Sequence, residues 1–255
     1  IIPEGSSISY EQLEEEVERV SRILTGCGMQ PGTAVSIVLG NGLEFMVTFL
    51  AVVRAGGIAA PLNPAYTIQE FKFYMEDASA QLVVTSEDAD FAVSAASQLN
   101  IRTVVTSITG NNHVAISRNG SELTRSIYSP PPLPEDVALF LHTSGTTSRP
   151  KGVPLTHNNL IASLSNIVRS YSLTPYDIAL VVMPLFHVHG LIGVALSTLN
   201  SGGTIVIPPR FSAGSFWQHQ ADTNATWYSA VPTIHQILLT RADNDSAPHQ
   251  AFRFI

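Results

Sequence analysis

Residues 139–160 read LFLHTSGTTSRPKGVPLTHNNL and carry more information than any other part of this chain of 255 residues. Apolar residues over 137–142 predict a strand, residues 143–152 a loop, and residues 156–171 a helix. Hydroxyls and free backbone N–H groups donate to phosphate oxygens, glycine lets a backbone approach closely, and cations oppose the charge. The segment has two glycines, the cations Arg149 and Lys151, and six hydroxyl side chains, at Thr143, Ser144, Thr146, Thr147, Ser148 and Thr156. In a chain of net charge -7, this segment is where a polyphosphate would be tolerated.

The loop differs from the G-x-x-x-x-G-K-[ST] phosphate loop, because Pro150 stands at the fifth position after Gly145 and Gly152 follows Lys151. Composition alone favours a second interpretation, a polar surface loop whose hydroxyls only cap the next helix, and it is the particular order of the residues that favours a phosphate site. The chain has a net charge of -7 and no Lys/Arg stripe, which argues against nucleic-acid binding. An anionic ligand would therefore be held by a local site.

Helices and short apolar strands alternate on both sides of this segment, which predicts βαβ units and a largely parallel sheet covered on both faces. A possible capping box joins Ser9 and Gln12. A polar and proline-rich connection over 107–135 separates two α/β subdomains, at 1–135 and 136–255. The predicted helices are 9–28, 43–55, 67–77, 88–99, 189–200, 212–222 and 232–241, and the predicted strands are 34–39, 81–85, 103–106, 179–182, 204–207 and 226–228.

Two further properties of the sequence limit the class of protein. The single cysteine, Cys27, excludes an internal disulfide framework and cannot make a metal site by itself, so a reducing compartment is expected. The most apolar stretch, residues 43–62, contains Glu44, Arg54 and Pro61 and does not predict a membrane span.

The order Ser-Gly-Thr-Thr-x-x-Pro-Lys-Gly at 144–152 resembles the phosphate loop of the adenylate-forming, or AMP-binding, superfamily, which includes acyl-CoA synthetases. Residues 31–66 and MPLFHVHG at 183–190 resemble an early structural motif and the fourth core motif of that superfamily. The resemblance covers all 255 residues and implies the N-terminal domain of the superfamily, with layered α/β subdomains, truncated and without the C-terminal domain.

The resemblance implies an acid–thiol ligase that uses ATP to turn a carboxylic acid into an acyl-adenylate and then, with CoA, into an acyl-CoA. In that case Thr146 and Thr147 would contact phosphate or Mg²⁺, with Thr146 the metal candidate, and Lys151 would be the cation. Arg149 is equally compatible with a solvent-exposed charge. The whole implied phosphate grip is Ser144, Gly145, Thr146, Thr147, Ser148, Arg149, Pro150, Lys151 and Gly152.

Two histidines follow Pro184 in the fourth motif. A lone histidine on an apolar stretch is more often a hydrogen-bonded packing residue, but the superfamily keeps an aromatic residue or histidine at the position of His187, beside the substrate carboxylate. The resemblance therefore implies a substrate-contacting, gating role for His187. His189 falls where relatives place a residue of the acyl pocket, although a structural hydrogen bond is an equal alternative. His235 lies in a segment resembling one wall of that pocket, and direct contact with substrate is the less favoured interpretation.

Within the superfamily, the sequence of these motifs is most similar to the branch that includes oxalyl-CoA synthetases. This similarity implies a small polar acid such as oxalate as the favoured substrate. The expected compartment is the cytoplasm or the peroxisome. Two alternatives stay open: an aryl or fatty acyl-CoA ligase of the same fold, and a truncated, non-catalytic product that binds nucleotide. Because the adenine-binding, ribose-binding and hinge motifs are absent from these residues, we expect this stretch alone to bind nucleotide weakly without turnover. The sequence does not indicate an oligomeric state.

Overall fold

The computed structural model describes residues 7–143, 150–241 and 251–255. The described chain forms two compact units, one of residues 8–160 and one of residues 161–255 together with residue 7. The first unit contains a largely parallel β-sheet and the second a parallel one, and helices flank both. The predicted α/β class with largely parallel sheets is confirmed. Within the described ranges, no helix is long and apolar enough to cross a membrane.

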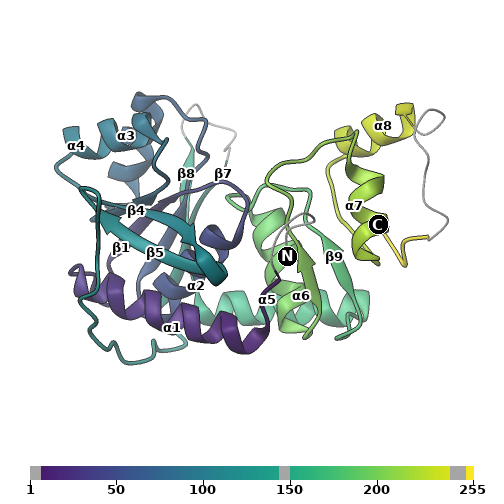
Figure 1. Ribbon diagram of the computed structural model, residues 1–255, viewed down its shortest axis with the longest axis horizontal. Coiled ribbons are helices and arrows are strands. Elements are labelled where there is room, and N and C mark those ends of the chain that lie inside the picture. The colour runs from purple at the N-terminus through teal and green to yellow at the C-terminus, as the bar shows by residue number, and fades with distance from the viewer. Residues whose placement is uncertain (1–6, 144–149, 242–250) are drawn as a thin grey trace. The chain divides into compact units, whose positions relative to one another are not determined.

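The first unit contains an eight-stranded sheet (Figure 1). Its strands are β1 (Ala34–Val38), β2 (Ile58–Pro61), β3 (Leu82–Thr85), β4 (Arg102–Thr109), β5 (His113–Arg118), β6 (Ser121–Glu122), β7 (Val137–Thr143) and β8 (Lys151–Thr156). Their order across the sheet is β6-β5-β4-β3-β1-β2-β7-β8. The five central strands pair in parallel, and antiparallel strands complete both edges, with β5 and β6 on one side and β8 on the other.

Helices cover both faces of this sheet, as Figure 1 shows. They are α1 (Tyr10–Gly26), α2 (Leu43–Arg54), α3 (Ile68–Asp77) and α4 (Asp90–Gln98), and α5 (His157–Tyr171) begins after β8. Helices α1 and α2 pack against each other on one face, and α3 and α4 on the other. All five residues of β1 are buried, as expected for a strand covered on both sides.

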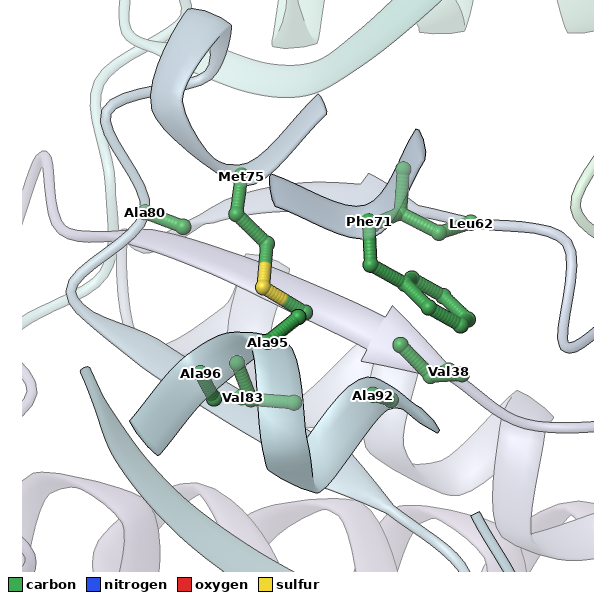
Figure 2. Close-up of a cluster of buried hydrophobic side chains, with 9 residues drawn as sticks. All are labelled: Val38, Leu62, Phe71, Met75, Ala80, Val83, Ala92, Ala95 and Ala96. Carbon is green, nitrogen blue, oxygen red and sulfur yellow. The ribbon is translucent and has the colours of Figure 1, made fainter. Parts of the chain in front are cut away.

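Helix α3 is held firmly at both its start and its inner face. Thr67 and Glu70 form a capping box, the same device that the sequence predicts at Ser9 and Gln12 and that the structure confirms there. Phe71 and Met75 point from α3 into a core that β1, β3 and α4 share (Figure 2). The members of this core are Val38, Leu62, Phe71, Met75, Ala80, Val83, Ala92, Ala95 and Ala96.

The second unit is built around two parallel strands, β9 (Ile178–Leu180) and β10 (Thr204–Val206). A π-helix, η2 (His189–Leu196), runs into α6 (Ser197–Asn200), and α7 (Phe216–Thr223) and α8 (Pro232–Arg241) follow. Its core is Leu180, Val182, Met183, Val206, Phe216, Ala225, Tyr228 and Leu238. Burial alone would raise the pKa of Asp177, but hydrogen bonds from Thr174 and the guanidinium of Arg253 lower it below its ordinary value.

Several elements differ from those the sequence predicts. Strand β8 contains Gly152 and Pro154, which argue against a strand, but β8 lies at the sheet edge, where the missing N–H of a proline is tolerated. The short β2 ends at Pro61, and β5 lies in the connection expected to be irregular. The predicted strand over 226–228 reduces to single-residue bridges at Trp227.

The single helix predicted over 189–200 is instead a π-helix followed by a short α-helix. The hydroxyls of Ser197 and Thr198 donate to the carbonyls of Gly193 and Val194 and compete with the regular backbone ladder there. The subdomain boundary predicted at 135/136 also differs from the division seen in the structure. Because β7 pairs with β2 in the sheet of the first unit, that unit extends to residue 160.

Candidate functional site

The predicted phosphate loop begins and ends in one β-hairpin. Strands β7 and β8 pair with Thr143 opposite Lys151 and His142 opposite Gly152. Of the predicted phosphate grip, Pro150, Lys151 and Gly152 are described by the structure. Ser144, Gly145, Thr146, Thr147, Ser148 and Arg149 lie outside the described residues. The hairpin therefore fixes where the chain leaves the sheet and where it returns, at Lys151.

Lys151 is exposed at the first position of β8. The cross-strand pairing with Thr143 holds its backbone at the return point of the loop. The exposed side chain follows residues 144–150 of the loop in sequence, at a backbone position that the strand pairing fixes. An ammonium about 4 Å from a phosphate oxygen gains on the order of 1–4 kcal/mol between the limits of bulk water and a partly screened protein surface.

Gly152 has a packing role that the sequence does not reveal. A Cβ atom at this position would lie 2.2 Å from Cζ of Phe140 and 3.0 Å from Oδ2 of Asp77. The interpretation from the sequence was that glycine lets the backbone approach phosphate. The described contacts provide a second reason, which is that β8 lies directly against the Phe140 ring.

His142 is a residue that the sequence analysis missed, although it stands at the start of the loop. Its side chain is 8% exposed, and its Nε2 atom lies 2.9 Å from Oδ2 of Asp77 at the end of α3. Its ring contacts Tyr74 edge-on at 4.6 Å between centroids and Phe140 at 5.2 Å. The sequence shows only that His142 is the last residue of the predicted apolar strand 137–142, and it does not indicate the partner of this histidine.

The two predicted substrate-contacting histidines belong to the second unit. His187 lies in the turn before η2, where its N–H donates to the carbonyl of Pro184 and its ring lies 4.6 Å from that of Phe186. Partial burial lowers the pKa of His187, so its imidazole is neutral at pH 7. A neutral imidazole offers one donor and one acceptor.

His189, the first residue of η2, is hydrogen-bonded through Nε2 to Oγ of Ser229 at 2.8 Å. Burial also lowers the pKa of His189. Gly190 follows, and a Cβ there would lie 2.3 Å from the carbonyl oxygen of Pro184, so only glycine allows the π-helix to start at this point. The sequence analysis did not select Ser229, which binds His189 from the segment 226–231.

His235 is held by two hydrogen bonds, from the hydroxyl of Tyr228 at 3.1 Å and to the carbonyl of Ala230 at 3.2 Å. It also borders an apolar hollow of about 370 Å³. The hollow is lined by Trp217, Tyr228, His235, Leu238, Leu239, Phe252 and Ile255. Neither His187 nor His189 lines it.

Comparison with known proteins decides the family. A family model described as AMP-binding enzyme matches residues 1–253. The chain belongs to the AMP-binding enzyme family. Within the family it is 44% identical to an oxalate–CoA ligase of Arabidopsis thaliana over 98% of this chain and 50% of that protein. It is 36% identical to an oxalate–CoA ligase of Saccharomyces cerevisiae over 99% of this chain and 52% of that protein.

A solved family structure supports the same assignment. The ATP-bound crystal structure of MatB from Rhodopseudomonas palustris matches with a TM-score of 0.79 and 29% identity, over 92% of this chain and 46% of MatB. The chain therefore spans about half the length of the family members it matches. Its described residues include no cluster of three or more His, Cys, Asp or Glu side chains that could hold a metal ion.

Proposed function

We propose that the protein containing this chain is an acid–thiol ligase that uses ATP to activate a carboxylic acid and then transfers the acyl group to CoA. The observation that carries the proposal is the hydroxyl-rich sequence of residues 144–149, closed by the Thr143–Lys151 pair in a chain of the AMP-binding family. Two of the relatives that the chain resembles are named oxalate–CoA ligases.

The reaction has two steps that balance without an external oxidant or base. A carboxylate oxygen attacks the α-phosphorus of ATP, the bond to the β-phosphate oxygen breaks, and pyrophosphate leaves. The sulfur of CoA then attacks the acyl carbon, AMP leaves, and the thiol proton passes to solvent. Because carboxylate and phosphates repel each other in the first step, the site must supply charge neutralisation and orientation.

In this proposal Lys151 neutralises charge on the β- and γ-phosphates, and the hydroxyls and backbone of residues 144–149 donate to their oxygens. Mg²⁺ bound with ATP would supply further charge neutralisation. A hydroxyl-rich loop suits a magnesium–nucleotide complex, because Mg²⁺ takes oxygen ligands and usually keeps several waters. Thr146 remains the proposed protein contact for the metal.

The proposed substrate is a small polar acid such as oxalate. A short dianion has no hydrocarbon tail, so donors must recognise it. The His189–Ser229 pair supplies polar atoms in the segment resembling a pocket wall, and His187 provides a neutral imidazole nearby in sequence. We assign His187 to contact with the substrate carboxylate and His189 to the acyl pocket.

One observation favours a different substrate class. The hollow beside His235 is lined by aromatic and aliphatic side chains, which would suit an aryl or fatty acyl group. This hollow and the His189–Ser229 pair therefore predict opposite preferences, and a substrate panel separates them.

The test uses the whole protein with ATP, CoA and four acids: oxalate, malonate, 4-coumarate and a medium-chain fatty acid. We expect acyl-CoA formation with oxalate at the highest kcat/KM. Preference for coumarate or the fatty acid would contradict the small-acid assignment but retain the ligase. ATP binding without pyrophosphate exchange for any acid would contradict the ligase itself and favour a non-catalytic nucleotide-binding protein.

His187→Ala tests the assigned contact. Loss of oxalate activity, with pyrophosphate exchange retained for another acid, would support a role in recognising the small dianion. Unchanged kinetics for every acid would rule that role out.

A further inference from the structure

The base of the phosphate hairpin is attached to helix α3 through one histidine, whose side chain is little exposed. His142 is the penultimate residue of β7, and its Nε2 atom lies 2.9 Å from Oδ2 of Asp77. The side chain of His142 is 8% exposed and that of Asp77 is 40% exposed. Because a carboxylate only accepts hydrogen bonds, Nε2 carries the proton in this contact. The bond joins elements that are 65 residues apart in the sequence.

Helix stability does not explain an aspartate at this position. Asp77 is the last residue of α3, where the carbonyl end of the helix dipole disfavours a negative charge. Packing does not explain the histidine either, because its neighbours Phe73, Tyr74 and Phe140 form an aromatic setting that an apolar ring would fill equally well. The hydrogen bond between His142 and Asp77 explains why both positions carry a polar side chain.

The second strand of the hairpin lies against the same carboxylate. The missing side chain of Gly152 leaves β8 so close that a Cβ there would lie 3.0 Å from Oδ2 of Asp77. His142 and Gly152 are cross-strand partners, and the next pair is Thr143 and Lys151. Asp77 therefore lies beside both strands at the His142–Gly152 pair, which directly precedes the last pair of the hairpin, Thr143 and Lys151.

Helix α3 is a rigid support for this carboxylate. Met75, two residues before Asp77, is fully buried in the core with Phe71 (Figure 2). A strand that slips by one residue turns every side chain to the opposite face of the sheet. Such a slip at the edge strand β8 would turn the side chain of Lys151 to the opposite face of the sheet.

We propose that Asp77 and His142 are positioning residues for ATP, which hold the β7–β8 hairpin in the register that presents Lys151 to the phosphates. The assignment rests on the proposed function, because it assumes that the loop binds ATP. It adds two residues that lie outside the loop and act through it.

The test compares His142 with a matched histidine at the other edge of the same sheet. His113 of β5 contacts two carboxylates, Glu16 at 3.3 Å and Glu122 at 3.6 Å, and has no loop of this composition beside it. His142→Phe and His113→Phe each replace a histidine by an apolar ring. In the whole protein we measure the KM for ATP and for the acid by pyrophosphate exchange, the Kd of ATP, and the thermal midpoint without ligand.

We expect His142→Phe to raise the KM and Kd for ATP about tenfold or more, because a misplacement of about 1 Å can cost on the order of 100-fold. The KM for the acid should stay within about twofold. His113→Phe should lower the thermal midpoint by a similar amount but leave the KM and Kd for ATP unchanged. Asp77→Asn keeps an acceptor for the Nε2–H bond, so it should retain ATP affinity, whereas Asp77→Ala should match His142→Phe.

Equal ATP constants for His142→Phe and His113→Phe, or equal rises of the ATP and acid KM in His142→Phe, would overturn the positioning role. Failure of Asp77→Asn to retain ATP affinity would overturn the hydrogen bond as its cause. If the wild-type protein binds ATP but exchanges no pyrophosphate, the proposed function fails, and the Kd values still decide the role of His142. Absence of ATP binding by the wild-type protein would overturn both proposals.

Discussion

At one edge of the eight-stranded sheet, β8 pairs antiparallel with β7, and at the other edge β5 and β6 pair antiparallel beyond β4. Each edge carries a histidine bound to carboxylate, His142 at the first and His113 at the second. The side chain of His142 is 8% exposed and that of His113 is 37% exposed. Both edges have antiparallel strand pairing, but only at the β7–β8 edge is the histidine side chain tightly packed, next to a hydroxyl-rich loop sequence.

This difference teaches that the sheet alone does not make a binding site. Antiparallel edge strands are a common way to complete a parallel sheet. What distinguishes the β7–β8 edge is the loop sequence and the dense contacts of Phe140, His142 and Gly152 beneath it. Paired substitutions at the two edges can therefore separate what the fold requires from what the site requires.

The largest effect on stability is expected at the glycines of the two hairpins. Gly152→Ala would place a Cβ atom 2.2 Å from Cζ of Phe140, whereas Gly110, between β4 and β5, has open space around a Cβ. Overpacking of this kind costs about 1–3 kcal/mol, so the thermal midpoint of Gly152→Ala should fall by several degrees. Gly110→Ala should stay within about 0.5 kcal/mol of wild type.

Phe140→Leu in the Gly152→Ala background gives the control for this prediction. The smaller side chain removes the clashing ring atom, so part of the lost stability should return. If Gly152→Ala and Gly110→Ala have the same thermal midpoint, the close contact with Phe140 does not constrain the hairpin.

The next largest effect is expected on the KM for ATP when Lys151 is replaced. Lys151→Met should raise the KM for ATP about tenfold, the equivalent of ~1.4 kcal/mol, and the difference from wild type should shrink at high salt because the site is exposed. Lys72, on α3 and hydrogen-bonded to Gln98, is the matched control, and Lys72→Met should leave the KM for ATP unchanged. A similar change in both variants would indicate a general charge effect.

The parts of the fold that the sequence predicts well are those with one dominant signal. Helix α8 has the predicted bounds, and the capping box at Ser9 marks the start of α1 within one residue. Apolar runs locate β1 and β3 because both faces of these strands are buried. In each case local sequence and tertiary packing favour the same structure.

The missed elements depend on contacts between distant residues. Pro154 argues against a strand unless β8 is known to lie at an edge, and that knowledge comes from the order of the whole sheet. The loop composition and the family resemblance located the candidate site, but not the partners of its residues. The bond from His142 to Asp77 and that from His189 to Ser229 join segments 65 and 40 residues apart, which no local pattern reports.

The capping boxes of α1 and α3 test whether α3 serves the β7–β8 edge in particular. Thr67→Ala and Ser9→Ala each remove the hydroxyl that accepts a backbone N–H bond, at a cost of about 1 kcal/mol. Both should lower the thermal midpoint by a similar amount. Only Thr67→Ala should also weaken ATP binding, because α3 carries Asp77; equal ATP affinity in the two variants would contradict a supporting role of α3.

The smallest expected effect concerns histidines without a carboxylate partner. Burial lowers the pKa of His187 and His189 below the ordinary value of 6.5. As pH falls through 6.5, the unfolded chain binds protons that the folded chain does not, so these residues make the protein less stable. The loss grows until the lowered pKa is reached and is constant below it. Asp177 does not contribute between pH 7 and 5, since its lowered pKa starts from 3.8.

His189→Gln isolates one of these contributions, because glutamine keeps a hydrogen-bonding group for Ser229 but does not titrate. The measurement is the thermal midpoint at pH 7, 6 and 5 for wild type and variant. We expect the midpoint of His189→Gln to fall less from pH 7 to pH 5 than that of the wild type. An equal fall would show that His189 is accessible enough to bind a proton in the folded state, and its neutral form could then not be used to explain recognition of a small acid.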